Sequence, residues 1–125
     1  MSNHTCDAFI VSCIDFRFQK YLKKWLGENF DMNNKTYDFV GFAGSTKNLE
    51  TIMGQLDISV RLHHVKGVVL IHHEECGAYE AESTHDRHAK DLNKAKKTIL
   101  EKYPDLSVSL FYLHLDGTFE EILEK

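Results

Sequence analysis

The segment of residues 65–71 constrains the fold of this chain more than any other. It is an apolar run rich in valine and isoleucine, interrupted only by Lys66 and Gly67, and it leads directly into His72 and His73. β-branched residues favour extended backbone, so the segment predicts a strand. A run with so little polar alternation indicates a strand buried on both faces, as in a parallel sheet.

Shorter apolar runs and amphipathic segments alternate along the rest of the chain. The apolar runs predict strands over 8–12, 37–42 and 108–113. The amphipathic segments predict helices over 18–26 and 86–103, and a third helix that is capped by Ser45 or Thr46 and ends at residue 60. Gly27 is the predicted end of the first helix, and a capping box over 118–121 predicts a short C-terminal helix. This order predicts an α/β fold with a mainly parallel, doubly wound, four-stranded sheet and helices on both faces.

Composition narrows the functional classes. A chain of 125 residues predicts a single domain over 1–125, and a net charge of −4 favours neither DNA nor RNA as a partner. No apolar run approaches the roughly 20 residues of a membrane span. The first residues lack the features of a signal peptide, so we predict a cytoplasmic protein. With three cysteines, metal binding or free thiols are favoured over a disulfide framework.

Metal-ligating side chains follow two of the predicted strands. Cys13 follows the first strand, His73 follows the segment 65–71, and Cys76 comes three residues later. Ligands of parallel sheets bind beyond the carboxyl ends of the strands, where the strand order reverses. If these two strands are neighbours, the three side chains converge. Two thiolates and an imidazole suit Zn²⁺, and Asp15 and Arg17 beside them favour a catalytic site that keeps one position open.

Two paired motifs then resemble those of the β-class carbonic anhydrases. They are Cys-x-Asp-x-Arg at residues 13–17 and His-x-x-Cys-Gly at residues 73–77. Ala43-Gly44 resembles the small-residue turn that the family carries between the motifs, and Leu115-Asp116-Gly117 resembles its last strand and turn. The resemblance covers about 8–117.

The resemblance implies a lyase that hydrates CO₂ reversibly to bicarbonate with a zinc-bound hydroxide. It implies one Zn²⁺ per chain, a catalytic pair, substrate-binding residues and a homodimer or higher homo-oligomer. The implied residues are Cys13, His73 and Cys76 for zinc, Asp15 and Arg17 for catalysis, and Gly77, Ala43 and Gly44 for substrate. Asp15 either pairs with Arg17 or ligates zinc, because the family shows both arrangements.

The chain also departs from the family pattern. Twelve residues precede Cys13, so we expect no N-terminal helical arm, and His72 stands where the family has glycine. His72 is predicted either to pack at the strand end or to relay protons. We therefore expect a dimer interface at the sheet edge, or on the helix 18–26 with Trp25 as an anchor.

Several residues and functions keep alternative interpretations. Cys6 is predicted to be a small buried thiol, and His85 and His88 are predicted to be solvated. Three other functions stay open: a related zinc hydrolase of COS or CS₂, a non-catalytic zinc-stabilised binding module, and a thiol redox protein.

Overall fold

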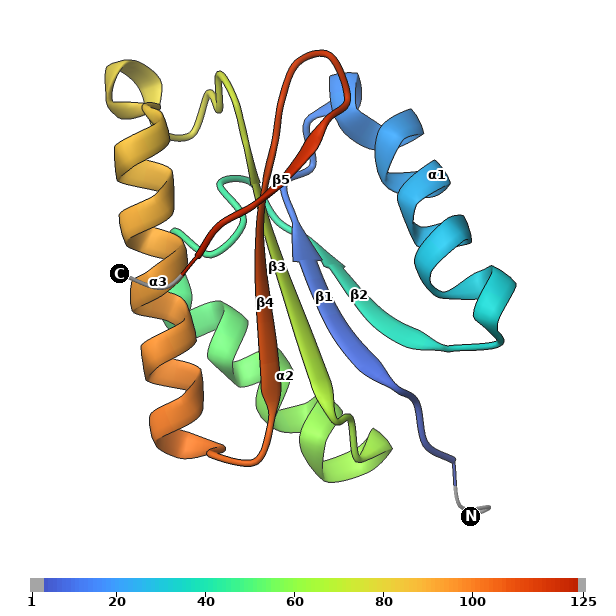
Figure 1. The fold of residues 1–125 in the computed structure, drawn as a ribbon. Helices are drawn as coiled ribbons and strands as arrows, with labels where there is room; N and C mark the ends of the chain where they lie inside the picture. The colour runs from blue at the N-terminus through green and yellow to red at the C-terminus, as the bar shows by residue number, and fades with distance from the viewer. Residues whose placement is uncertain (1–3, 124–125) are drawn as a thin grey trace.

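A computed structural model describes residues 4–123 and contains one central sheet (Figure 1). The sheet has five strands in the order β2-β1-β3-β4-β5. The strands are β1 (Ala8–Ser12), β2 (Tyr37–Gly41), β3 (Gly67–His73), β4 (Ser107–Leu113) and β5 (Phe119–Glu121). The first four run parallel, and β5 runs antiparallel to β4.

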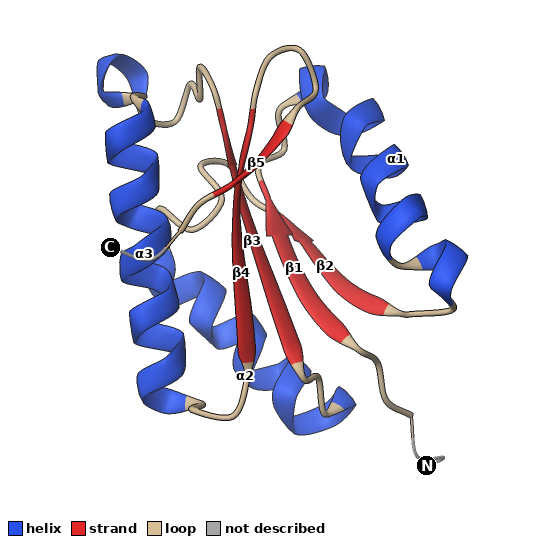
Figure 2. Cartoon of the chain, in the orientation of Figure 1, coloured by secondary structure: helices blue, strands red, loops and turns tan. Residues whose placement is uncertain are grey.

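Helices cover both faces of the sheet (Figure 2). The helices are α1 (Gln19–Asn29), α2 (Leu49–His63) and α3 (His85–Lys102). Successive residues of β1 point to opposite faces. Ile10 therefore packs in the core beneath α1, whereas Phe9 and Val11 pack in the core with α2 and α3. Burial on both sides explains why β1 is apolar at nearly every position.

The predicted α/β class, with its mainly parallel sheet and helices on both faces, is confirmed. The predicted number of four strands is wrong, because residues 118–121 do not begin a helix: Phe119 starts β5 and its ring stacks on Trp25 at 5.1 Å. Trp25, predicted as an interface anchor, is thereby packed within its own chain. Gly27 does not end α1, which continues to Asn29, and Asn48 rather than Ser45 or Thr46 caps α2.

The strand order places a topological reversal at the centre of the sheet. β1 lies between β2 and β3, with Val11 opposite Leu70 in the parallel register. The carboxyl ends of β1 and β3 therefore meet at one edge, and the predicted ligands follow those ends. Within the described residues, no helix is both long enough and apolar enough to cross a membrane.

Candidate metal centre

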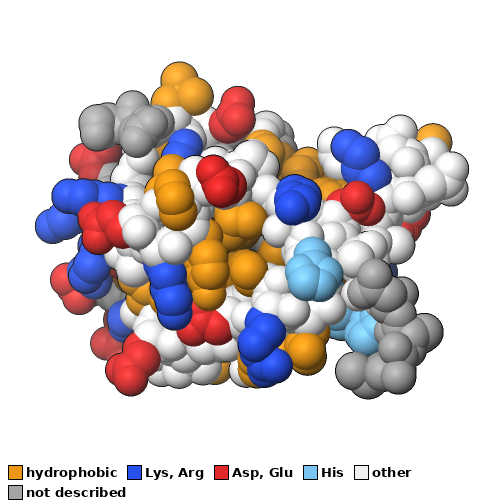
Figure 3. Space-filling view, turned by 90° about the horizontal axis from the view of Figure 1, so that it is seen from below, with side chains coloured by type: hydrophobic (Ala, Val, Ile, Leu, Met, Phe, Trp, Pro, Cys, Tyr) orange, Lys and Arg blue, Asp and Glu red, His pale blue; other side chains and the backbone are white. Residues whose placement is uncertain are grey.

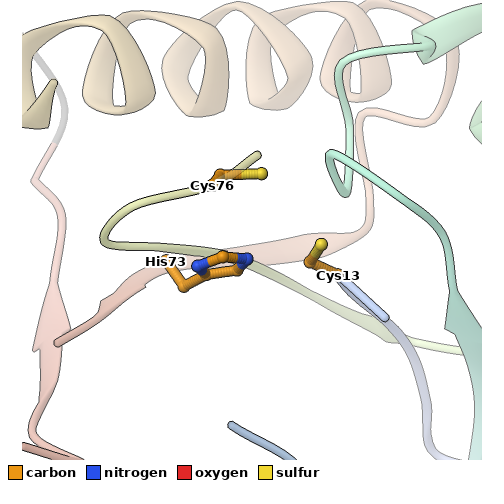
Figure 4. A group of neighbouring side chains, drawn as sticks. All are labelled: Cys13, His73 and Cys76. Atoms are coloured by element: carbon orange, nitrogen blue, oxygen red, sulfur yellow. The ribbon is translucent and has the colours of Figure 1, made fainter. Parts of the chain in front are cut away.

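Three side chains meet where β1 and β3 end. Cys13 follows β1, His73 is the last residue of β3, and Cys76 lies in the loop beyond it. Their candidate ligand atoms all lie within 4.8 Å of one another, and all three residues are buried. Figure 4 shows the two sulfur atoms and the imidazole ring around a common space. The structure thus brings together the three residues that the sequence predicts as metal ligands.

The imidazole of His73 is oriented toward this space by its other nitrogen. Nδ1 lies 2.7 Å from the carbonyl oxygen of Glu74, and because a carbonyl only accepts, Nδ1 carries the proton. The lone pair is then on Nε2, which is buried and has no hydrogen-bond partner. An unsatisfied buried nitrogen beside two thiols is costly without a ligand. A histidine that donates its second N–H to a carbonyl is typical of metal sites.

The two thiols are prepared unequally for deprotonation. A hydrogen bond from the Cys76 thiol, with further help from His73, lowers the pKa of Cys13. The backbone N–H of Gly44 also donates to Cys13 Sγ at 3.4 Å. The same Cys13–Cys76 contact and burial raise the pKa of Cys76. Two sulfurs and one imidazole nitrogen are the donor set that Zn²⁺ prefers, so the residues present fit this ion.

Asp15 is held beside the centre by a forked pair with Arg17. Arg17 Nη2 donates to Asp15 Oδ2 at 2.8 Å, Nε donates to Oδ1 at 3.1 Å, and the Arg17 backbone N–H also donates to Oδ1 at 2.9 Å. These hydrogen bonds lower the pKa of the Asp15 carboxyl. Oδ2 is still only 3.9 Å from His73 Nε2. Of the two arrangements that the sequence left open, the structure shows the Asp15–Arg17 pair.

Glu75, an exposed loop residue, fixes the other side of the Arg17 guanidinium, and the sequence did not predict this contact. Arg17 Nη1 donates to Glu75 Oε1 at 3.1 Å, and Nη2 donates to the Glu75 carbonyl oxygen at 2.9 Å. The loop between His73 and Cys76 therefore orients the arginine that orients Asp15. The opposite charge of Glu75 within the second motif is a signal that could have suggested this contact.

The predicted substrate-binding residues border the site in different ways. Gly44 is buried with a φ of +82°, and a Cβ built there would lie 3.2 Å from the Ala78 and Lys47 side chains. A residue with a side chain would be strained there. Ala43 and Gly77 are exposed, and a Cβ built on Gly77 would meet nothing within 4 Å.

A buried pair of histidines supports the site from beneath. His72 Nδ1 lies 2.7 Å from His88 Nδ1, and His72 Nε2 lies 2.7 Å from Thr46 Oγ1. His88 Nε2 contacts Ser83 Oγ at 2.9 Å, and that hydroxyl accepts the Cys76 backbone N–H at 2.8 Å. The prediction that His88 is solvated is wrong, because the side chain is fully buried. No sequence pattern marked Ser83.

Burial has a clear effect on the histidine pair. Mainly through desolvation, the pKa of His72 falls to about 3 and that of His88 to about 4. Both rings are therefore neutral near pH 7, and each can offer one donor and one acceptor to the network.

Similar folds occur among solved carbonic anhydrase structures. The carbonic anhydrase of Streptococcus mutans aligns with a TM-score of 0.69 and 17% identity over 98% of this chain and 86% of that one. A chain from the crystal structures of two tetrameric β-carbonic anhydrases of Sordaria macrospora aligns with a TM-score of 0.58 and 14% identity over 95% of this chain and 81% of that one. At these identities the likeness shows the fold.

Sequence comparison gives closer relationships. An uncharacterized protein of Rickettsia bellii (strain RML369-C) is 33% identical over 94% of this chain and 82% of its own length. The family model described as "Putative carbonic anhydrase" matches residues 3–123. The chain therefore belongs to this carbonic anhydrase family and has the β-class fold.

Proposed function

We propose that this chain is a zinc-dependent lyase that hydrates CO₂ reversibly to bicarbonate. Cys13 Sγ, His73 Nε2 and Cys76 Sγ hold one Zn²⁺ per chain in this proposal. The observation that carries it is the buried, unpartnered Nε2 of His73, which faces two thiols within 4.8 Å. The carbonic anhydrase family supports the choice of substrate.

Asp15 is the proposed catalytic carboxylate. When bound, zinc supplies a Lewis acid that lowers the pKa of water to about 7. Once that water has released one proton to solvent, Asp15 Oδ2 would accept a hydrogen bond from the remaining O–H, which would turn an oxygen lone pair toward the CO₂ carbon. The lowered pKa of Asp15 keeps it an acceptor. Arg17 and Glu75 hold the carboxylate in this role and keep it out of the fourth ligand position.

The proposal also covers the substrate-binding residues, the cellular location and the assembly. The backbone N–H of Gly77, an exposed residue, donates a hydrogen bond to a substrate oxygen in this proposal, while Ala43 and Gly44 form the wall of the site. We propose one functional domain over 1–125, a cytoplasmic location and a homodimer or higher homo-oligomer. The tetrameric Sordaria enzymes support an assembly. The free cysteines of the described residues agree with a reducing compartment.

A stopped-flow CO₂ hydration assay on protein loaded with one equivalent of zinc tests the proposal. We expect hydration well above the uncatalysed rate, and we expect Cys76→Ser to abolish it and to lose zinc from this site. A zinc-loaded protein that leaves the CO₂ hydration rate unchanged would contradict the proposal. Hydrolysis of COS or CS₂ by that protein would then identify the related hydrolase.

A further inference from the structure

A second group of metal-ligating side chains lies at the opposite edge of the sheet. Cys6 precedes β1, Asp38 lies in β2, and His63 ends α2. Their candidate ligand atoms lie within 4.8 Å of one another, and all three residues are partly buried. Figure 3 looks onto the edge where the parallel strands begin and shows histidine side chains on it. The carbonic anhydrase site at the carboxyl ends of the strands does not use these residues.

Backbone contacts hold the three ligands in place. The Cys6 N–H donates to the His63 carbonyl oxygen at 3.0 Å, which joins the start of the chain to the end of α2. Asp38 is fixed by β2, where it pairs with Phe9 in the parallel register. Three different elements therefore present a sulfur, a nitrogen and an oxygen donor to one place without any rearrangement of the backbone.

The side-chain hydrogen bonds leave part of the donor set available. His63 Nδ1 lies 2.7 Å from Asp38 Oδ2, and the Ser59 hydroxyl donates to the same oxygen at 2.6 Å. Both contacts use Oδ2, so Oδ1 is the oxygen that can turn toward an ion. Because a carboxylate only accepts, His63 Nδ1 carries a proton here, and the Cys6 thiol donates to the Ala8 carbonyl oxygen at 3.6 Å. Zinc would displace both protons on binding. The imidazole and carboxylate are also about a quarter exposed or more, at 28% and 30%. An ion can reach them from solvent.

The three donors match one class of ion. One thiolate, one carboxylate and one imidazole suit Zn²⁺ better than Mg²⁺ or Ca²⁺, which prefer oxygen ligands, and water would complete a tetrahedral shell.

We propose that Cys6, Asp38 and His63 bind a second zinc ion, which ties the start of the chain to β2 and α2. Zinc bonds to nitrogen and oxygen of about 2.0–2.2 Å place tetrahedral ligands roughly 3.3 Å apart. The His63 and Asp38 atoms, now 2.7 Å apart, have to separate by a few tenths of an ångström, or Asp38 has to present Oδ1. Small side-chain rotations achieve this.

The competing interpretation is a plain His63–Asp38 ion pair that fastens α2 to β2. An ion pair of this kind needs no sulfur. Cys6→Ser leaves the His63–Asp38 contact in place and removes only the thiolate, so it separates the two interpretations. His63→Asn removes an imidazole ligand, and His64→Asn is its matched control, because His64 is the exposed neighbour in a left-handed conformation that asparagine tolerates.

The test is a titration of the metal-free full chain with CoCl₂, followed by competition with ZnCl₂. We expect two equivalents of metal per chain for wild type and for His64→Asn, and one equivalent for His63→Asn and Cys6→Ser. Each of the latter variants should also lose the thiolate-to-cobalt absorption that accompanies the second equivalent. Far-UV circular dichroism checks that every variant is folded.

Two outcomes would overturn the second site. One is a wild-type chain that saturates with one equivalent, and the other is a folded Cys6→Ser that still binds two. Cys76→Ser keeps this test independent of the proposed function. In that variant the Cys6 site should still fill, so a failure of the carbonic anhydrase site and a failure of the second site give different titrations.

Discussion

At the scale of single residues, Arg17 holds the carboxylate of Asp15, the proposed catalytic group, in place. Its guanidinium makes the forked contact with Asp15, whose Oδ2 lies 3.9 Å from His73 Nε2. Without Arg17 the carboxylate is free to rotate toward the dication as a fourth ligand. We predict that Arg17→Ala keeps its zinc and loses CO₂ hydration by about 100-fold or more, because the reacting oxygen is displaced. Zinc analysis and stopped-flow kinetics measure both quantities.

The matched control is Arg87→Ala. Arg87 has a similar exposure and also contacts two carboxylates, Glu82 at 2.9 Å and Asp91 at 3.2 Å, away from the three ligands. This variant should hydrate CO₂ at the wild-type rate. Wild-type activity in Arg17→Ala would refute the holding role and leave the Asp15–Arg17 pair structural.

Asp15→Asn should fail for a different reason. An amide is a poorer zinc ligand than a carboxylate, and its NH₂ group donates where Asp15 accepts. We predict that Asp15→Asn keeps zinc, keeps the fourth position open and loses at least about 10-fold in hydration rate. Zinc X-ray absorption should show an added protein oxygen in Arg17→Ala but not in Asp15→Asn. The same coordination in both variants would contradict this distinction.

At the scale of elements, the loop before α2 depends on Gly44. Its φ of +82° strains any residue with a side chain, and a Cβ there would lie 3.2 Å from the Ala78 and Lys47 side chains, which would have to move by a few tenths of an ångström. We predict that Gly44→Ala lowers the free energy of unfolding by about 1–3 kcal/mol. Gly54→Ala is the matched control: it lies in α2 with nothing within 4 Å and should raise that free energy by about 0.5–1 kcal/mol. Urea denaturation measures both, and equal effects would contradict the argument.

The contact between α3 and β3 gives the fold a dependence on pH. The folded chain binds a proton on His88 only near its lowered pKa of about 4, whereas an ordinary histidine binds one near 6.5. The unfolded chain therefore binds more protons in this window. The His88 contribution to stability is complete above about pH 6.5 and is lost as the pH falls toward 4, by up to about 1.4 kcal/mol per pH unit.

Urea denaturation between pH 4 and 7.5 tests this dependence. His88→Gln should reduce, but not abolish, the pH dependence of the free energy of unfolding, because His72, whose pKa falls to about 3, contributes in the same window. The variant is less stable overall because it disturbs a fully buried residue. The exposed His64→Asn should keep the wild-type slope. An unchanged slope in His88→Gln would show that another group titrates in this range.

Much of the element order could be predicted, because the strands and helices differ clearly in their apolar period. Residues 118–121 show where that reasoning fails. Their capping-box pattern is local, but the ring of Phe119 packs against Trp25 and Phe111, and the Phe119 backbone pairs with β4. Long-range packing overrides a local helix signal of this size. His88 fails similarly, since its polar helix gives no sign of the partner His72.

The three candidate metal ligands were easier to predict from the sequence than the residues that hold them in place. Cys13, His73 and Cys76 were predicted together because the ends of neighbouring parallel strands meet at one edge. Ser83 holds the Cys76 backbone through a loop whose course depends on α3. A single serine in a polar segment carries no pattern that would reveal such a contact.

At the scale of the whole molecule, exposed apolar side chains gather beside β2. Ile14 is 60% exposed and Phe39 is 42% exposed, on either side of Gly41, and Phe16 is 86% exposed two residues beyond Ile14. We predict a homodimer through this sheet edge, with a mass near twice 14.5 kDa in light scattering. Phe39→Asp should shift the protein to monomer.

Leu123→Asp is the control for the dimer. Leu123 is 72% exposed but follows β5, at the other side of the sheet. This variant should remain dimeric. A wild-type chain that scatters as a monomer at high concentration would refute the assembly.

The antiparallel strand β5 sets how far such an assembly can extend. It forms one edge of the sheet with only three residues, so within the described residues the longer edge strand is β2, which pairs with β1 on one side only. A two-fold axis through β2 would join two sheets and leave a short β5 at each end. Sheet growth then stops at the dimer, because the two β2 edges are paired with each other. β5, which the sequence did not predict, therefore limits edge pairing to a closed dimer rather than a growing fibre.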